Sequence, residues 1–509
     1  MRSAALILRA GRFKLVALPF LLGALTVLGF APFYLFFVPT LTLAALFHLW
    51  LHAGSRRAAF LIGLMFGLGL FGCGASWVYV SMHDYGMMPL PLAVLATLLF
   101  CTFLALFPAL AGWLQANIKP QPCWRLLLAM PACFALYEWS LGWVFTGFPW
   151  LTLGYSQAPA SPLAGYAPLL GVYGVSLLLA VSAGLLAFTY NAWRAATGRA
   201  WLALSSLLIL WAGGAGLQNA AWTQPVGALL TVSLLQGNIA QDMKWREDRL
   251  RSTLATYRDM VLASNSRLII LPETAVPLFY DNVPPSYLEE LAQHARRQGG
   301  DIILGLPERD FVQRVYYNSV LSLGSAPTQF YRKQHLVPFG EFVPLKPVFG
   351  RIIEAMQIPL TDFARGAATQ PPLALAGQQV AMAICYEDVF GEELIRQLPQ
   401  ATLLVNVSND AWFGDSIAPR QHLQIAQMRA LESGRYMLRA TNTGVTAIVN
   451  EKGRVLEYAP VFHTAVLNGT AQGMMGSTPY VRWGNSLFLA LDALAMVVAL
   501  GISRRARDG

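Results

Sequence analysis

The chain has 509 residues, of which 55% are hydrophobic and only 12% are charged, and its mean hydropathy is +0.47. Water-soluble proteins carry about 25% charged residues, so this composition excludes a chain that is water-soluble over its whole length. The formal net charge is +9, but residues 223–483 hold as many acidic as basic residues. The excess lies in short segments beside apolar runs, which indicates membrane topology, and no nucleic-acid partner is expected.

Eight apolar segments predict membrane-spanning helices. The first run, Leu15–Leu51, would make a single helix of about 55 Å, nearly twice the thickness of a bilayer core, so two spans joined at Pro32 fit better. The basic start of the chain also fits a cleaved signal peptide, but more apolar runs follow at once. The other six predicted spans are Ala58–Val80, Leu90–Leu114, Trp124–Phe145, Ala167–Tyr190, Trp201–Leu217 and Ser486–Ile502.

Basic residues alternate between the loops that join these spans. The loops Ser81–Pro89 and Thr146–Gly165 contain no Lys or Arg, whereas the loops on the side of the N-terminus are basic. By the positive-inside rule both termini are expected in the cytoplasm. An odd number of spans precedes the long polar segment, which is therefore expected outside the cytoplasm. The expected domains are a transmembrane region at 1–222, a catalytic domain at 223–483, and a final transmembrane helix with a cytoplasmic tail at 484–509.

The long polar segment alternates strand-like and helix-like patterns, which predicts an α/β domain with its own core. The predicted strands are Leu229–Leu235, Leu268–Leu271, Asp301–Leu306, Ser319–Leu323, Gln379–Ile384, Thr402–Val407 and Val445–Val449. The predicted helices are Arg246–Ser264, Ser286–Gln298, Glu392–Leu398 and His422–Ser433.

Cys385 is the single cysteine of this domain and directly follows the apolar strand that ends at Ile384. A lone cysteine in an oxidising compartment cannot form an internal disulfide, so it is either buried and inert or a reactive thiol. Two further segments carry chemistry that suits a thiol nucleophile. Glu273 follows another apolar strand, and Lys333 and Glu341 lie in a loop punctuated by Pro and Gly.

A cysteine attacks as the thiolate, which is scarce at neutral pH because the free side chain has a pKa near 8.5. A carboxylate can remove the thiol proton, and an ammonium can stabilise first the thiolate and then a tetrahedral oxyanion. Glu273, Lys333 and Cys385 supply this set. Each also has a structural interpretation, since the glutamate could cap a turn, the lysine could be solvated and the cysteine could be core.

The order and surroundings of these three residues resemble the nitrilase (carbon–nitrogen hydrolase) superfamily, whose Glu-Lys-Cys triad lies in an α-β-β-α sandwich. That resemblance covers about Leu229–Asn468. The chain as a whole is similar to the apolipoprotein N-acyltransferase family, because several motifs occur in the same order within a frame of about eight spans. These motifs are Thr146-Gly-Phe-Pro-Trp150, Gly154-Tyr-Ser-Gln157, Gln236-Gly-Asn-Ile239 with Trp245, Pro338-Phe-Gly-Glu341, Cys385-Tyr-Glu387 and Ser408-Asn-Asp-Ala-Trp-Phe-Gly414.

The resemblance implies a multi-pass enzyme of the bacterial inner membrane with a periplasmic catalytic domain and no cofactor. The enzyme would take an acyl chain from a phospholipid and hold it as a thioester on Cys385. It would then pass the chain to the α-amino group of the diacylglyceryl-cysteine that begins an apolipoprotein. Glu273 would be the general base, and Lys333 would stabilise the thiolate and the oxyanion. We expect a monomer.

The resemblance also implies supporting residues. Glu341 would position the lysine, and Tyr386 and Glu387 would flank the nucleophile. Ser408 and Asn409 are expected to shape the pocket.

Two further features are expected at the mouth of the site. By the same resemblance, Trp245 would lie near the lipid-facing opening. The segment Pro344–Phe363 carries an apolar stripe at helical spacing that includes Phe349, Ile353 and Met356. This stripe predicts a mobile lip exposed to lipid, although core packing is the alternative.

Three other functions compete with this interpretation. A membrane-anchored amidase would use the same triad with water as acceptor, although an anchor of eight spans is unexpected for a soluble substrate. A Cys/His hydrolase would require His335 or His422 as the base. A transporter would require polar residues at mid-membrane, and only Glu138 and Asp492 qualify. The sequence contains no spacing typical of a metal or nucleotide site, so neither ligand is expected.

Overall fold

The computed structural model describes residues 13–118, 121–343 and 362–508. The described residues form two compact units. The membrane unit comprises those of Met1–Tyr79, Leu90–Ala220 and Trp483–Gly509, and the α/β unit comprises those of Val80–Pro89 and Ala221–Arg482. Each unit is described by itself below.

The membrane unit is entirely helical. Its main helices are α2 (Leu18–Thr26), α3 (Val38–Leu51), α4 (Arg56–Gly74), α6 (Leu90–Gln115), α8 (Met130–Ser140), α9 (Ala167–Arg194), α10 (Arg199–Leu217) and α17 (Ser486–Asp508). Among the described residues, five helical segments are long and apolar enough to cross a membrane: Arg56–Gly74, Leu90–Gln115, Pro162–Arg194, Arg199–Leu217 and Ser486–Arg505. The chain therefore has a helical region suited to a bilayer, and the count of eight spans stays a prediction.

The three remaining apolar segments are shorter or interrupted. Leu15–Gly29 and Val38–Leu51 fall below the length of a full span. The segment that begins at Pro122 is divided into α7 (Pro122–Trp124), a π-helical turn (Arg125–Ala129) and α8. Hydropathy does not reveal such interruptions, because a π-turn keeps the same side chains.

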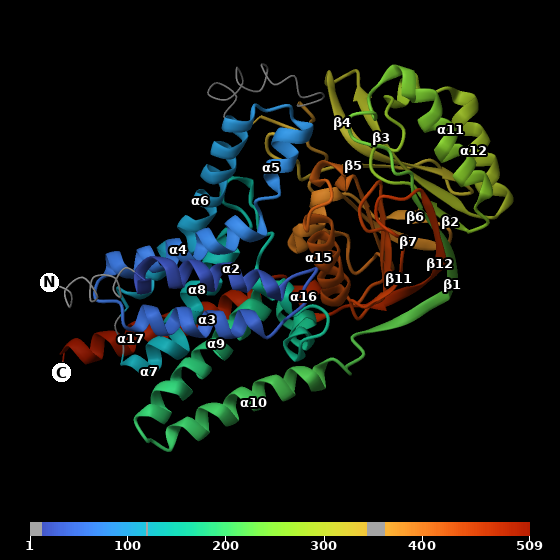
Figure 1. Ribbon diagram of the computed structural model, residues 1–509. Helices are drawn as coiled ribbons and strands as arrows, with labels where there is room; N and C mark the ends of the chain where they lie inside the picture. The colour runs from blue at the N-terminus through green and yellow to red at the C-terminus, as the bar shows by residue number, and fades with distance from the viewer. Residues whose placement is uncertain (1–12, 119–120, 344–361, 509) are drawn as a thin grey trace. The chain divides into compact units, whose positions relative to one another are not determined.

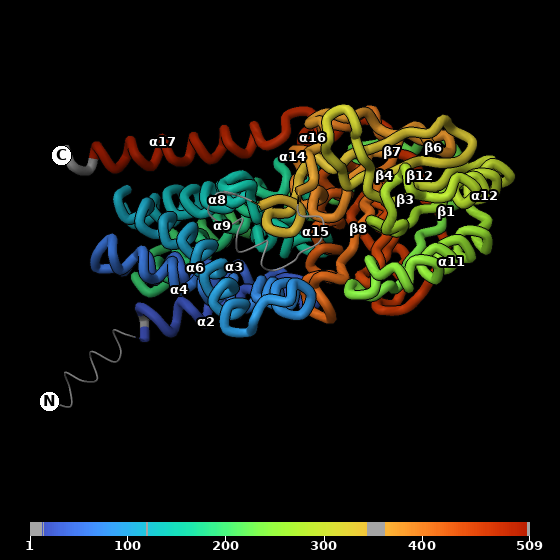
Figure 2. Tube along the Cα trace, turned by 90° about the horizontal axis from the view of Figure 1, so that it is seen from above, coloured from blue at the N-terminus to red at the C-terminus, as the bar shows by residue number. Residues whose placement is uncertain are grey.

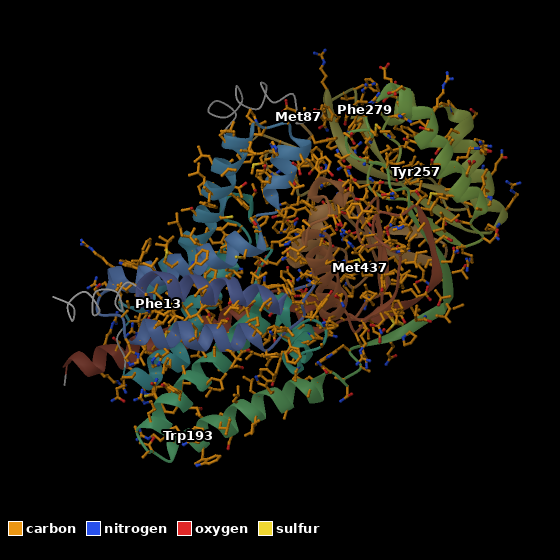
Figure 3. All side chains as sticks on the ribbon, viewed as in Figure 1. Phe13, Met87, Trp193, Tyr257, Phe279 and Met437 are labelled. Atoms are coloured by element: carbon orange, nitrogen blue, oxygen red, sulfur yellow. The ribbon has the colours of Figure 1, made fainter. Side chains whose placement is uncertain are left out.

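Small residues allow the helices of this unit to pack closely. A Cβ added at Gly67 of α4 would lie 2.7 Å from Cα of Ala105 on α6, so the two backbones approach as closely as glycine permits. Helix α10 runs back along α9 after a short turn (Figure 1). Trp193 lies at that turn, with its ring centroid 6.5 Å from that of Trp201 (Figure 3).

The α/β unit contains two six-stranded sheets. The first has the order β12-β1-β2-β3-β4-β5 and the second β11-β10-β9-β8-β7-β6. The strands of the first sheet are β1 (Thr223–Gln236), β2 (Leu268–Ile270), β3 (Asp301–Asp310), β4 (Val315–Gly324), β5 (Phe330–Arg332) and β12 (Ala465–Gly476). Those of the second are β6 (Leu373–Leu375), β7 (Gln378–Ile384), β8 (Leu403–Ser408), β9 (Met437–Thr441), β10 (Ala447–Val449) and β11 (Val455–Tyr458). The central strands of each sheet are parallel and the outer ones antiparallel.

The sheets pack face to face. Val232 and Ile270 of the first sheet share one buried cluster with Val380 and Val405 of the second. Helices α11 (Glu247–Ala263) and α12 (Pro285–Arg297) lie side by side on the outer face of the first sheet (Figures 1 and 2). Helix α15 (Ala418–Ser433) covers the outer face of the second. These four layers are the expected α-β-β-α sandwich.

Some predicted elements differ from those observed. The predicted helix Glu392–Leu398 is confirmed in part, because α14 (Gly391–Leu394) continues as a 3-10 helix (Ile395–Gln397) before Pro399. Five strands were not predicted: β5, β6, β9, β11 and β12. Four of them have five residues or fewer, and β12 contains Gly and Asn yet pairs with β1 from Thr223 to Gln236.

Candidate active site

Polar residues lie at the carboxyl ends of β2 in the first sheet and of β7 and β8 in the second. Glu273 follows β2, Cys385 directly follows β7, and Ser408 is the last residue of β8. In parallel sheets these ends are the usual position of a binding site. The structure thus brings together residues that are far apart in the sequence.

Cys385 occupies a sharp turn between β7 and a 3-10 helix (η9, Cys385–Val389). Its φ of +53° lies in the left-handed region, which is costly for a residue with a side chain and is typical of functional sites. Its carbonyl accepts a 3.0 Å hydrogen bond from Nδ2 of Asn406. The residue as a whole is partly exposed. Burial and the Glu273 carboxylate outweigh the Lys333 ammonium and raise the pKa of the Cys385 thiol above its ordinary value.

Lys333 follows β5 and supplies a buried positive charge. Its Nζ lies 2.9 Å from the carboxylate of Glu341 and 3.5 Å from Oε1 of Glu273. Burial alone would lower the pKa of Lys333, but the two carboxylates outweigh burial and raise the pKa above its ordinary value. Lys333 therefore stays an ammonium at any physiological pH. The expected association of Glu341 with this lysine is present in the structure.

Glu273 is held by donors on both carboxylate oxygens. Oε2 accepts from the backbone N–H of Asn409 at 2.9 Å, and Oε1 accepts from Nδ2 of Asn318 at 2.7 Å. The glutamate turn packs against β3 at Gly305, where an added Cβ would lie 2.6 Å from the Pro272 carbonyl oxygen. A glycine is therefore required at this point of β3.

Asn318 is a site residue that sequence reasoning missed. It lies on β4, is 5% exposed, and its Nδ2 also donates to Oε1 of Glu341 at 2.9 Å. The backbone carbonyl oxygen of Asn318 accepts a hydrogen bond from the backbone N–H of Lys333 at 2.8 Å. The signal in the sequence was weak. A single Asn next to an apolar run is as typical of an ordinary strand end as of an active site.

Lys244 is a second site residue that the sequence did not reveal. Its ammonium is buried and donates a 3.0 Å hydrogen bond to the backbone carbonyl of Glu273. Burial lowers the pKa of Lys244 to about 8, against the influence of Glu273 and Cys385. The adjacent Trp245 is 37% exposed, and its loop contacts Glu273 through Lys244.

Glu387 joins the lysine loop to the nucleophile turn. Oε1 accepts from the backbone N–H groups of Gln334 and His335 at 2.6 and 3.2 Å. Oε2 accepts from Ile384 N–H at 2.7 Å and from the Tyr331 hydroxyl at 3.0 Å. Burial raises the pKa of Glu387 to about 7 in spite of these donors. Glu387 thus holds the backbone after Lys333 next to the backbone before Cys385.

Tyr386 belongs to an aromatic group beside the nucleophile. Its ring lies 5.1 Å from that of Phe390, on which the His335 ring stacks at 3.6 Å. Nδ1 of His335 lies 3.2 Å from Glu393. These contacts give His335 an aromatic and carboxylate environment instead of a place beside the thiol.

Ser408 and Asn409 follow one another at the end of β8, where the backbone N–H of Asn409 contacts Glu273. The Ser408 hydroxyl donates to Oδ1 of Asp410 at 2.7 Å. The Asn409 side chain donates to Gln241 at 2.7 Å and accepts from Asn442 at 3.0 Å. The pocket-shaping role expected of these two residues is consistent with these contacts.

The lip residues Phe349, Ile353 and Met356 lie outside the described residues. Within the part of the chain that the structure describes, no group of three or more His, Cys, Asp or Glu side chains is arranged to hold a metal ion.

Both parts of the chain match known protein families. Residues 231–480 match the family model for carbon-nitrogen hydrolases, which defines the class of the α/β unit. Residues 22–185 match the N-terminal domain model of apolipoprotein N-acyltransferases. The chain therefore belongs to the apolipoprotein N-acyltransferase family, as its relatives also show.

Three relatives named apolipoprotein N-acyltransferase illustrate the similarity. The protein of Nitrosomonas europaea is 58% identical over 96% of this chain and 97% of its own length. That of Chromobacterium violaceum is 48% identical over 95% and 93%. That of Methylococcus capsulatus is 47% identical over 96% and 95%.

Proposed function

We propose that this enzyme transfers an acyl chain from a phospholipid to the N-terminal α-amino group of diacylglyceryl-cysteine in apolipoproteins. The observation that carries the proposal is the assembly of Glu273, Lys333 and Cys385 in a chain that is 58% identical, over nearly its whole length, to a named N-acyltransferase. The helical region is suited to a bilayer, which supports a lipid as the acyl donor. An amidase with a soluble substrate would not need such a region.

In the first half-reaction, Glu273 removes the proton from the Cys385 thiol. The sulfur attacks the ester carbonyl carbon of the phospholipid, and Lys333 stabilises the negative charge on the carbonyl oxygen. When the tetrahedral intermediate collapses, the carbon–oxygen ester bond breaks and Glu273 returns the proton to the departing alkoxide. The products are a thioester on Cys385 and a lysophospholipid.

In the second half-reaction, the α-amine of the apolipoprotein attacks the thioester carbonyl carbon. A carbon–nitrogen bond forms, the carbon–sulfur bond breaks, and a proton from the amine passes through Glu273 to the thiolate. Glu341 contacts Lys333, and Asn318 contacts Glu273, which supports the proposal because both groups are held in place without substrate.

The proposed topology places both termini in the cytoplasm and residues 223–483 in the periplasm. The support is the alternation of basic loops with the Lys- and Arg-free loops Ser81–Pro89 and Thr146–Gly165. The bounds 1–222 and 484–509 for the membrane-embedded parts and a monomeric state belong to the same proposal. A membrane-impermeant lysine label should react with the α/β unit in cells with a permeabilised outer membrane.

The experiment that tests the function measures whether the acceptor peptide is acylated. The enzyme in phospholipid nanodiscs is mixed with a diacylglyceryl-cysteine peptide, and the peptide is weighed by mass spectrometry. The peptide should gain one acyl chain while lysophospholipid appears in equal amount, and an N-acetylated peptide should gain none. Release of free fatty acid with an unchanged peptide would instead identify a hydrolase that uses water.

A further inference from the structure

A buried group of charged side chains lies under the nucleophile turn, and the mechanism above does not use it. The group, called here the charge cluster, consists of Asp388, Asp410, His422 and Arg439. Each of these side chains is at most 1% exposed. Burying four ionisable groups is costly unless their charges balance and their hydrogen bonds are satisfied.

His422 projects from α15 between the two carboxylates. Its Nε2 lies 2.8 Å from Oδ1 of Asp388, and its Nδ1 lies 3.1 Å from Oδ1 of Asp410. A neutral imidazole has one N–H and one lone pair, so one of these contacts would set a lone pair against a carboxylate oxygen. Only the imidazolium donates to both aspartates.

The charges support the same protonation state. Burial and the Arg439 guanidinium act to lower the pKa of His422, but Asp388 and Asp410 outweigh them and raise it. Arg439 lies 3.3 Å from Oδ2 of Asp388 and 2.9 Å from Oδ2 of Asp410. With His422 protonated, two cations therefore balance two anions. The aspartates face the ring from the turns after β7 and β8, and Arg439 faces it from β9.

The charge cluster is connected to Cys385 by a short chain of hydrogen bonds. Nη1 of Arg439 donates to Oδ1 of Asn406 at 2.7 Å, and Nδ2 of Asn406 donates to the Cys385 carbonyl at 3.0 Å. Asp410, which accepts from the Ser408 hydroxyl at 2.7 Å, also acts on the thiol through its charge, which raises the pKa of Cys385.

We propose that His422 is a positioning residue that stays an imidazolium throughout the reaction and, by neutralising Asp388 and Asp410, keeps Cys385 reactive. This inference rests on the proposed role of Cys385 as the nucleophile. His422 is not the base of a Cys/His pair, because both ring nitrogens donate to aspartates. Without its charge, the cluster has a net negative charge next to the thiol, where Asp410 already acts to raise the pKa of Cys385.

The protonation state is tested first, in the unmodified full-length protein. Protein labelled with ¹⁵N-histidine is prepared in detergent micelles, and the signals of His422 are assigned by their loss in His422→Gln. Both ring nitrogens of His422 should carry protons from pH 6 to pH 8. An unprotonated ring nitrogen at pH 7 would overturn the proposal.

The effect on the nucleophile is tested by restoring the charge balance. The background is a full-length variant in which Cys73, Cys101, Cys123 and Cys133 are replaced by Ala, so that iodoacetamide reports on Cys385 alone. His422→Gln leaves the cluster with one negative charge in excess. The double variant His422→Gln/Asp388→Asn is neutral again and keeps the contact of Ser408 with Asp410.

In His422→Gln, alkylation of Cys385 at pH 7.5 should slow by about tenfold, as expected for a rise of one unit in the thiol pKa. The double variant should recover to within about threefold of the background. Equal rates in the single and double variants would overturn the proposal, since a purely steric role of His422 predicts no rescue by Asp388→Asn. Alkylation needs no phospholipid, so a normal alkylation pattern without acyl transfer would contradict the proposed function alone.

Discussion

The side-chain amide of Asn318 donates a 2.7 Å hydrogen bond to Oε1 of Glu273, the same oxygen that faces the Lys333 ammonium. The second hydrogen of that amide is directed to Glu341 at 2.9 Å. Asn318 thus keeps two carboxylates apart while both contact one lysine. A neutral donor at this position satisfies both carboxylates and adds no third negative charge between them.

Replacing Asn318 by Asp tests this arrangement with almost no change in shape. A third carboxylate would force one of the three to hold a proton, because like charges at contact distance cannot all ionise. We expect thioester formation on Cys385 to slow by about a hundredfold or more, measured by rapid-quench mass spectrometry at pH 7.5. Thioester formation should slow less in Asn318→Ala than in Asn318→Asp. Equal rates in the two variants would show that the added negative charge does not cause the loss.

Lys333→Met removes the ammonium and keeps the length of the side chain. Thioester formation should fall by about a hundredfold or more, because one oxyanion donor is lost. The pKa of Lys333 is raised above 10.5, so the stability that its ion pairs provide is fully present below pH 10.5 and is lost only above it. The variant should therefore melt at a lower temperature by the same amount at pH 6 and pH 9. A difference that disappears within this range would contradict the raised pKa.

Lys244→Met should affect stability in a pH-dependent manner. The pKa of Lys244 is lowered from 10.5 to about 8, so the buried charge destabilises the fold below pH 8, on the order of 3 kcal/mol, and stability rises with pH from 8 to 10.5. The variant escapes this cost but leaves the Glu273 carbonyl unpaired, which costs about 1–3 kcal/mol. Its melting temperature should be close to that of the native protein at pH 7 and clearly lower at pH 9.5. Arg246→Met, at an exposed side chain, serves as the control and should show no such trend.

Glu387→Gln should separate positioning from charge at the nucleophile turn. The carboxylate accepts four hydrogen bonds, whereas a glutamine amide would direct N–H groups at one pair of these donors. We expect about 1–3 kcal/mol of lost stability and at least a tenfold loss of activity. Denaturant unfolding and acyl transfer measure the two effects. Glu393→Gln, which alters only the contact with His335, should leave activity within about threefold.

The sequence predicted the elements whose patterns are local. Strands such as β7 were apparent as apolar runs, and the positions of Glu273, Lys333 and Cys385 at the ends of such runs were visible without a structure. The π-turn at Arg125–Ala129 and the short strands were not predicted from the sequence. Neither produces a distinct pattern of apolar and polar residues.

The residues that the sequence missed act through distant partners. Lys244 reaches a backbone carbonyl 29 positions away, and Asn318 reaches Glu273 across 45 positions. Nothing in the local pattern distinguishes such a lysine from a solvated one. His422 was recognised only as a possible base, because the two aspartates that surround it become neighbours in the folded sheet.

The most direct measurement of the central claim is the intact mass of the enzyme after incubation with phospholipid alone. The account predicts a gain of one acyl chain, located on Cys385 by peptide mapping and removed by neutral hydroxylamine, as expected for a thioester. Cys385→Ala should gain nothing, and added diacylglyceryl peptide should discharge the native adduct faster than buffer does. An adduct that forms on Cys385→Ala, or peptide acylation by that variant, would contradict the mechanism.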